Sequence, residues 1–300
     1  MAKIAVELEQ ALTRRAVSGR PGGTTARVLA HGDGWTVADV VCTSGPHDRP
    51  FEERHAHVTI AIVAAGSFEY RAAAGRELMT PGALMLGNAG ESFECGHEHG
   101  QGDRCLAFGY TPDYFETVAA AAGIRGRRPD FGLIRLPPVR ALSPLVARAC
   151  AGLAGAVAAP WEELSLKLAA RTLELARGLS ADSTSTPPGA LGRVTGIVRM
   201  IERQPDAGLS LAALAREAGL SPYHFLRTFE QVTGVTPHQY VRRARLREAA
   251  MRLATERTKV VDVALDCGFG DVSNFNHAFR GEFGMSPRAH RRQVQQRRSG

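Results

Sequence analysis

Two segments near the C-terminus frame a set of polar side chains with the same aromatic, glycine and proline residues. Phe225 and Phe229 precede Gly234 and Pro237, and the same residue types recur fifty positions later. The Asn, Arg, Ser and His residues between them can pair with base edges or with phosphates. The candidate DNA-contacting residues are Tyr223, His224, Arg227, Ser273, Asn274, Asn276, His277 and Arg280, with Arg242 and Arg245 from the segment after the first copy.

For one isolated helix, an ordinary solvated face is the simpler explanation of such residues. The charge distribution argues otherwise. Residues 1–187 hold 19 Lys and Arg against 20 Asp and Glu, whereas residues 188–300 hold 18 against 10. Two copies of one pattern in a basic part of the chain favour an interface for double-stranded DNA.

Histidine and cysteine side chains in the first half form a second group that could do chemistry. Imidazole and thiolate groups bind zinc and related transition metals. The glycines among them also fit a loop whose histidines are merely solvated, so both interpretations stay open. The candidate metal ligands are His55, His57, Cys95, His97, His99 and Cys105.

Local helix signals indicate which elements carry the repeated pattern. Ser210 and Ser221 are of the types that cap helices, and Pro222 suits a first helical turn. Pro237 opens a helix that we expect to reach Thr255, about 28 Å at 1.5 Å per residue. The sequence therefore predicts an all-α domain with two helix–turn–helix motifs, at about 210–233 and about 259–283, joined by a long helix.

The first half has a different pattern. Short β-rich runs between residues 27 and 110 are separated by Gly and Pro turns, which is typical of a barrel or sandwich. Two amphipathic helices are expected between Ser143 and Leu179. The small, polar residues 180–189 predict a linker. We thus expect an α+β protein with a β-rich N-terminal domain at 1–179, whose two helices could pack on a second subunit, and a DNA-binding domain at 190–300.

The C-terminal part resembles the AraC/XylS family of transcriptional regulators. The resemblance covers about 85 residues and is clear in GFGDVSNFNHAFRGEFGMSP, from Gly268 to Pro287, and weaker in AGLSPYHFLRTFEQVTGVTP, from Ala218 to Pro237. It implies two helix–turn–helix motifs joined by a rigid helix. Leu226 and Val272 depart from the family, which usually has polar residues there; contact with a thymine methyl group is open to them.

Members of this family commonly carry a cupin-like β-barrel before the DNA-binding part, and residues 50–110 resemble one weakly. His55, His57 and Gly66 are similar to the first cupin motif, and Gly75 with Pro81 to the second. Ala61 and Ile62 stand where a glutamate ligand is expected. A binding barrel is therefore favoured over the alternative, a cupin-type metal-dependent enzyme fused to a nucleic-acid-binding domain.

Composition limits the remaining possibilities. No run of about 18 apolar residues occurs and the first residues lack an export signal, so we expect a cytoplasmic protein without a membrane partner. Five scattered cysteines indicate reduced thiols. We expect a non-enzymatic transcription factor that forms a homodimer, binds operator or promoter DNA, contacts RNA polymerase and responds to a small-molecule, metal or thiol-reactive effector.

Overall fold

The computed structural model describes residues 2–98, 100–124, 129–155, 159–178 and 189–296. It contains two compact units. The sandwich unit comprises Ala5–Pro138 and Pro160–Ser185, and the helical unit comprises Met1–Ile4, Val139–Ala159 and Thr186–Gly300. Of the predicted linker, residues 180–188 lie outside the described residues.

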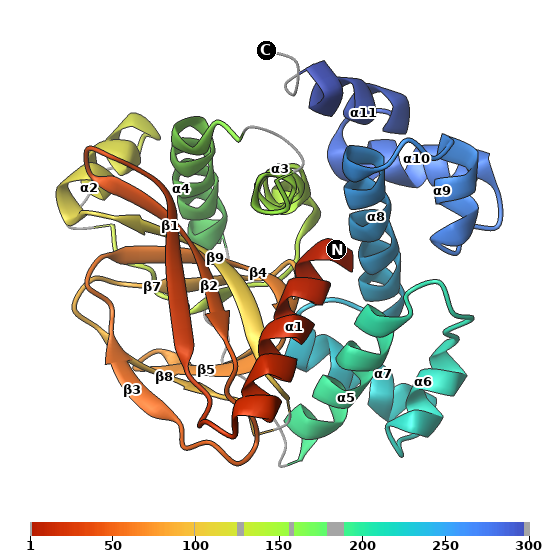
Figure 1. Ribbon diagram of the computed structural model, residues 1–300, viewed down its shortest axis with the longest axis horizontal. Helices are drawn as coiled ribbons and strands as arrows, with labels where there is room; N and C mark the ends of the chain where they lie inside the picture. The colour runs from red at the N-terminus through yellow and green to blue at the C-terminus, as the bar shows by residue number, and fades with distance from the viewer. Residues whose placement is uncertain (1, 99, 125–128, 156–158, 179–188, 297–300) are drawn as a thin grey trace. The chain divides into compact units, whose positions relative to one another are not determined.

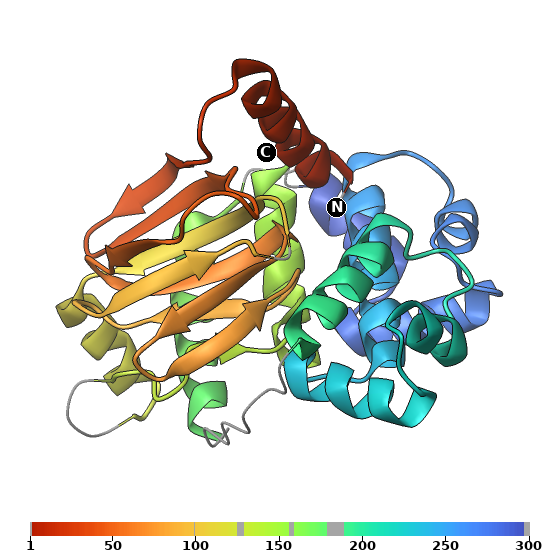
Figure 2. The ribbon, with the colours of Figure 1, turned by 90° about the horizontal axis from the view of Figure 1, so that it is seen from below.

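Strands dominate the sandwich unit, where the described residues form two sheets with antiparallel neighbours (Figures 1 and 2). The orders are β1-β2-β9-β4-β7-β10 and β3-β8-β5-β6. The bounds are β1 Thr24–Gly32, β2 Trp35–Cys42, β3 Phe51–Arg54, β4 Val58–Gly66, β5 Phe68–Ala72, β6 Gly75–Met79, β7 Leu84–Gly87, β8 Ser92–Gly96, β9 Asp103–Tyr110 and β10 Arg135–Leu136.

The two sheets share one apolar core. Val63 of β4, Tyr70 of β5 and Cys105 of β9 belong to a single buried cluster, so side chains from both sheets meet. Within the described residues, no strand of the larger sheet pairs with a strand of the smaller one. Of the two architectures expected, barrel or sandwich, the described residues form a sandwich of two open sheets that pack face to face, and the cupin-like barrel is not confirmed.

Helices cover the other face of the six-stranded sheet. Side chains alternate along β9, so Phe108 and Tyr110 point away from the shared core. Phe108 contacts Trp161, and the Tyr110 hydroxyl donates to the Ser165 carbonyl at 2.9 Å. These contacts involve α4 (Trp161–Gly178), which packs beside α2 (Pro112–Ala121). Helix α1 (Ala2–Ser18) was not expected from the sequence; Arg15 ties it to Asp48 at 2.6 Å.

The helical unit confirms the predicted pair of helix–turn–helix motifs. Ser210, Ser221, Thr236 and Asp271 each cap a helix with a side-chain oxygen. The connecting helix begins at Pro237 and ends at Thr255, as predicted. The bounds are η1 Arg140–Leu142, α3 Ser143–Leu153, α5 Ala190–Arg203, α6 Leu211–Glu217, α7 Pro222–Thr233, α8 Pro237–Thr255, α9 Val260–Asp266, α10 Val272–Phe283 and α11 Pro287–Gln296.

Helix α3 belongs to the helical unit, although the sequence boundaries assigned it to the N-terminal domain. It packs against α8 and α10. Ala147 lies against a buried cluster that contains Phe275 and Phe279, and the Ser143 hydroxyl donates to the Glu282 carboxylate. No described helix has the length and apolar character that a membrane span requires.

Candidate nucleic-acid interface

Helix α7 presents the polar residues of the first motif to solvent. Phe225 and Phe229 are fully buried and hold the helix in the domain. Tyr223, His224 and Arg227 are exposed, as expected for residues that contact DNA. The Ser221 hydroxyl lies 2.8 Å from Nδ1 of His224, and the Arg227 guanidinium lies over the Tyr223 ring. These contacts orient the exposed face before any ligand binds.

Helix α10 repeats this arrangement with a more polar surface. The Asp271 carboxylate accepts a hydrogen bond from the backbone N–H of Asn274 at 2.7 Å, which fixes the first turn of the helix. Phe275 and Phe279 are fully buried on the opposite side. The five predicted contact residues are all exposed: Ser273, Asn274, Asn276, His277 and Arg280.

Helix α8 connects the two motifs, with α6 and α7 near one of its ends and α9 and α10 near the other (Figure 1). A groove, here called the central groove, runs between the motifs. Residues of α7, α8 and α10 all line it, so one ligand can contact both motifs. Its lining includes Leu226, Thr236, His238, Arg242, Asn274 and His277. The exposed His238 was missed by the sequence analysis because it lies outside the repeated pattern.

A second, basic depression lies beside α10. It is lined by Lys259, Arg288 and Arg292 together with Val272 and Asn276. Arg288 and Arg292 are exposed on α11. These cations lie beside the exposed polar face of α10. They are suited to contact DNA phosphates, which would orient the protein on the duplex without reading its sequence.

The two arginines predicted on α8 have different surroundings. Arg242 is exposed and lines the central groove. Arg245 donates to the carbonyls of Pro205, Gly268 and Ala207 at 2.6, 2.8 and 3.0 Å. Arg245 also lines this groove, but three of its five N–H donors already bind backbone carbonyls, so we assign it first to the fold. The spacing could not distinguish the two side chains.

The predicted metal ligands of the sandwich unit do not all lie together; some are buried and others are exposed. Nε2 of His55 lies 2.7 Å from the Tyr70 hydroxyl, and the His55 ring stacks on Phe93. Burial lowers the pKa of His55 to about 4. His57 is exposed between β3 and β4. His99 lies outside the described residues.

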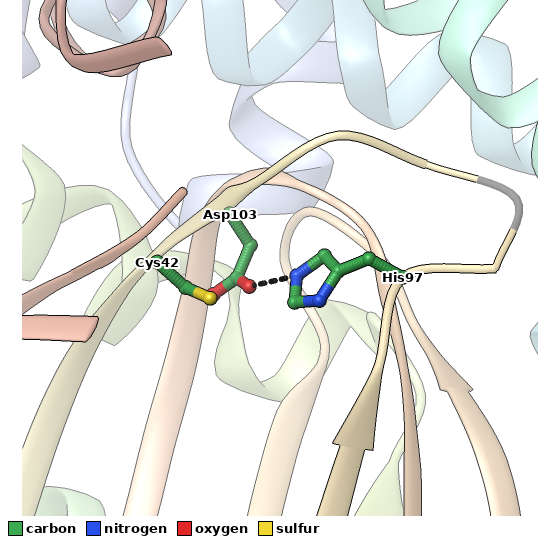
Figure 3. A group of neighbouring side chains, drawn as sticks. All are labelled: Cys42, His97 and Asp103. Carbon is green, nitrogen blue, oxygen red and sulfur yellow. Dashed lines mark hydrogen bonds and ion pairs between the residues drawn. The ribbon is translucent and has the colours of Figure 1, made fainter. Parts of the chain in front are cut away.

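Three other side chains meet where the two sheets come together (Figure 3). Cys42 ends β2 and pairs in register with Asp103, the first residue of β9, so both point to the shared core. His97 follows β8 of the smaller sheet, and its Nε2 donates to Oδ1 of Asp103 at 2.7 Å. The ligand atoms of Cys42, His97 and Asp103, here called the inter-sheet cluster, lie within 4.8 Å of one another.

The remaining predicted ligands lie near this cluster. Cys105 follows Asp103 on the same face of β9, and its thiol donates to Oδ2 of Asp103 at 3.3 Å. Burial raises the pKa of Cys105 and of Cys95 on β8 well above the usual value. Cys42 and Asp103 were missed because their proximity depends on the pairing of strands about 60 residues apart.

Electrostatics couple the members of the inter-sheet cluster. Burial favours the neutral thiol, but hydrogen bonds with His97 and Ser44 lower the pKa of Cys42. Burial opposes a charge on His97, yet its hydrogen bonds with Asp103 and Cys42 raise its pKa to about 9. The cluster thus combines a polarised thiol, an imidazole and a carboxylate with little exposure to water.

Two capped helix–turn–helix motifs on one connecting helix define a DNA-binding regulator, and residues 214–293 match the family model of a helix-turn-helix domain. The chain belongs to the AraC/XylS family of transcriptional regulators. It is 31% identical over 98 residues to the regulatory protein SoxS of Salmonella typhimurium, a match that covers 33% of this chain and 92% of SoxS.

Other relatives match over the same part of the chain. The probable transcriptional regulator LumQ of Photobacterium leiognathi is 40% identical over 87 residues, but the match covers only 29% of this chain and 35% of LumQ. The DNA-binding domain of the transcriptional factor AdpA, solved with a target DNA, is 29% identical, with a TM-score of 0.35. That match covers 36% of this chain and 96% of the AdpA domain.

Proposed function

We propose that the protein is a sequence-specific transcriptional regulator in which the helical unit reads operator DNA and the sandwich unit binds an effector. The observation that carries this proposal is the pair of exposed polar faces on α7 and α10. Both helices also line the central groove, α7 through Leu226 and α10 through Asn274 and His277. Each face is held by two fully buried phenylalanines and a side-chain cap, so it is rigid before binding. Rigid helices lose little entropy on binding, which favours sequence readout.

The two motifs offer different side chains for contacts with DNA. Asn274, Asn276 and Arg280 on α10 offer bidentate partners for adenine, guanine or phosphate, whereas α7 offers Arg227 beside an aromatic ring. Arg242, Arg288 and Arg292 supply cations for the phosphates. Because α10 has more polar groups than α7, the operator is expected to be asymmetric, with more base contacts under the second motif.

The other parts of the proposal concern assembly and control. A cupin-like relationship of the sandwich unit is supported by its two antiparallel sheets around a shared core. Homodimerisation is supported by the amphipathic α4, on which Leu166 is 47% exposed. A dimer would present two helical units to repeated half-sites, and the promoter-bound protein would contact RNA polymerase.

Substitutions of contact residues on α7 and α10 test the proposal. Arg227→Ala and His277→Ala should each weaken binding to operator fragments about tenfold or more and affect random DNA less, because base contacts carry sequence information. A mobility-shift assay at fixed salt, with operators selected from genomic fragments, measures both affinities.

Arg193→Ala provides the matched control, since Arg193 is exposed on α5 and lines neither depression beside the motifs. It should leave the ratio of specific to non-specific affinity unchanged. Equal losses on operator and random DNA for Arg227→Ala and His277→Ala would contradict sequence readout by these helices.

A further inference from the structure

The inter-sheet cluster has the donor set of a transition-metal site. A thiol, an imidazole and a carboxylate converge from β2, the chain after β8 and the start of β9. Calcium and magnesium prefer sets of oxygen ligands, whereas zinc accepts sulfur, nitrogen and oxygen together. A thiolate and a carboxylate would also balance the charge of a divalent ion, which matters at a site shielded from water.

The distances fit a small rearrangement around one ion. Zinc bonds of about 2.0 to 2.3 Å set the ligand atoms of a tetrahedral site roughly 3.3 to 3.8 Å apart. In the cluster these atoms already lie within 4.8 Å of one another, and the hydrogen bond from His97 to Asp103 spans 2.7 Å. Rotamer adjustments of about 1 Å would therefore convert the hydrogen-bonded cluster into a coordination site.

The backbone around the cluster keeps its members in place. The Gly100 amide donates to the His97 carbonyl at 3.1 Å, and the Gly102 amide donates to the Ser44 carbonyl at 2.8 Å. Gly102 has φ +61°, and a Cβ there would lie 2.7 Å from the Cys42 carbonyl oxygen. The turn before Asp103 thus approaches the end of β2 closely, as glycine alone allows.

We propose that Cys42, His97 and Asp103 bind zinc and that this ion is the effector of the sandwich unit. The site differs from the ligand set suggested by spacing, since His55 and His57 are excluded and Cys42 and Asp103 are added. Three protein ligands leave a fourth coordination position for a non-protein ligand such as water. The effector role rests on the proposed function, whereas the zinc site does not.

Such an ion would join the two sheets. Cys42 and Asp103 belong to the six-stranded sheet, while His97 directly follows a strand of the four-stranded sheet. Zinc binding would therefore fix the chain between β8 and β9 against the end of β2. The ion would stabilise the folded sandwich by mass action and restrict a loop that is otherwise held by hydrogen bonds.

Metal titration of the full-length protein tests the site. After chelator treatment under reducing conditions, cobalt(II) should bind at one equivalent and give the near-ultraviolet thiolate band and strong visible bands of a tetrahedral site. Zinc should displace cobalt and raise the unfolding temperature by several degrees. Cys42→Ser should abolish the thiolate band, and Asp103→Asn should weaken binding at least tenfold.

Two variants serve as controls, with folding checked by circular dichroism. His57→Ala removes an exposed histidine of the spacing-based set, and Cys267→Ser changes a buried thiol of the helical unit. Both should bind cobalt as the wild type does. Sub-stoichiometric metal in the wild type, or equal binding by the wild type, Cys42→Ser and Asp103→Asn, would overturn the site.

A separate arm tests the effector role. Saturating zinc should change operator affinity at least fivefold in the wild type and leave that of Asp103→Asn unchanged. Tight zinc binding without any change in operator affinity would refute the effector role. Failure of the DNA-binding proposal appears differently, as equal affinity for operator and random DNA with or without zinc.

Discussion

Arg242 and Arg245 show how the surroundings of a side chain decide its role. They lie three residues apart on α8, and spacing alone made both candidates for phosphate binding. The Arg242 side chain is free in solvent at the central groove, whereas Arg245 joins the turn at Pro205 and Ala207 to Gly268. The two backbone segments that Arg245 joins approach each other closely: Gly268 has φ +82°, and a Cβ at this residue would lie 2.8 Å from Cα of Asp206.

Alanine substitutions separate these two roles. Arg242→Ala should reduce the salt dependence of DNA binding by about one unit in the slope of log K against log salt, with no loss of stability. Arg245→Ala should lower the free energy of unfolding by about 2 to 3 kcal/mol, because three carbonyls lose a charged donor. Urea unfolding and salt-dependent titrations measure the two effects, and the opposite pattern would contradict the assignment.

His55 makes the stability of the sandwich unit dependent on pH. Its pKa is lowered from the ordinary 6.5 to about 4 by burial, so between these values the unfolded chain binds a proton that the folded chain does not. Stability is therefore complete above about pH 6.5 and decreases as the pH falls toward 4. From pH 7 to pH 5 the expected loss is about 2 kcal/mol.

The matched comparison is the His55→Gln variant. The glutamine side-chain amide can replace the hydrogen bond of His55 to the Tyr70 hydroxyl, but it does not titrate. Urea unfolding followed by tryptophan fluorescence reports on this unit, because Trp35 and Trp161 both lie in it. The difference between pH 7 and pH 5 should shrink by about 2 kcal/mol in the variant. The same pH dependence in both proteins would show that His55 is not responsible.

At the scale of elements, α3 contributes to the second helix–turn–helix motif. Ala147 packs against the cluster of Phe275 and Phe279, so Ala147→Glu places a charge at a partly buried apolar contact. We expect the helical unit to lose about 2 kcal/mol of unfolding free energy. Ala141→Glu, at an exposed site on η1, should have little effect.

The two units can be followed separately in this experiment. Most of the described helical residues belong to the helical unit, so far-ultraviolet circular dichroism follows mainly that unit, whereas both tryptophans report on the sandwich unit. Ala147→Glu should shift the dichroism transition and leave the fluorescence transition in place. A fluorescence shift alone would contradict the assignment of α3 to the helical unit.

Elements with local signals could be predicted from the sequence, and those fixed by distant partners could not. Ser221, Pro222 and Pro237 determine helix starts through hydrogen bonds and φ preferences within one turn. The inter-sheet cluster depends on the register of β2 with β9, which no local pattern specifies. For His97 the sequence left a strand and a loop open, and the structure ends β8 at Gly96, directly before it.

At the scale of the whole molecule, positive charge concentrates in the C-terminal part of the chain, which forms most of the helical unit. Residues 188–300 have a net charge of +8, with 18 Lys and Arg against 10 Asp and Glu, and they contain both DNA-reading motifs. Such a charge increases encounter rates with DNA over about a Debye length, roughly 8 Å at physiological salt. Residues 1–187, with 19 Lys and Arg against 20 Asp and Glu, add little to this attraction.

The position of α3 also has a consequence for synthesis on the ribosome. Ser143 and its partner Glu282 are 139 residues apart, so α3 emerges long before α8 and α10, the helices on which it packs. Translating that interval at about 5 to 20 residues per second takes roughly 7 to 28 seconds. During this interval the nascent chain contains α3 but not yet α8 and α10, so the apolar face of α3 has no partner to pack on. Chaperones that hold nascent chains could bind that face during this time.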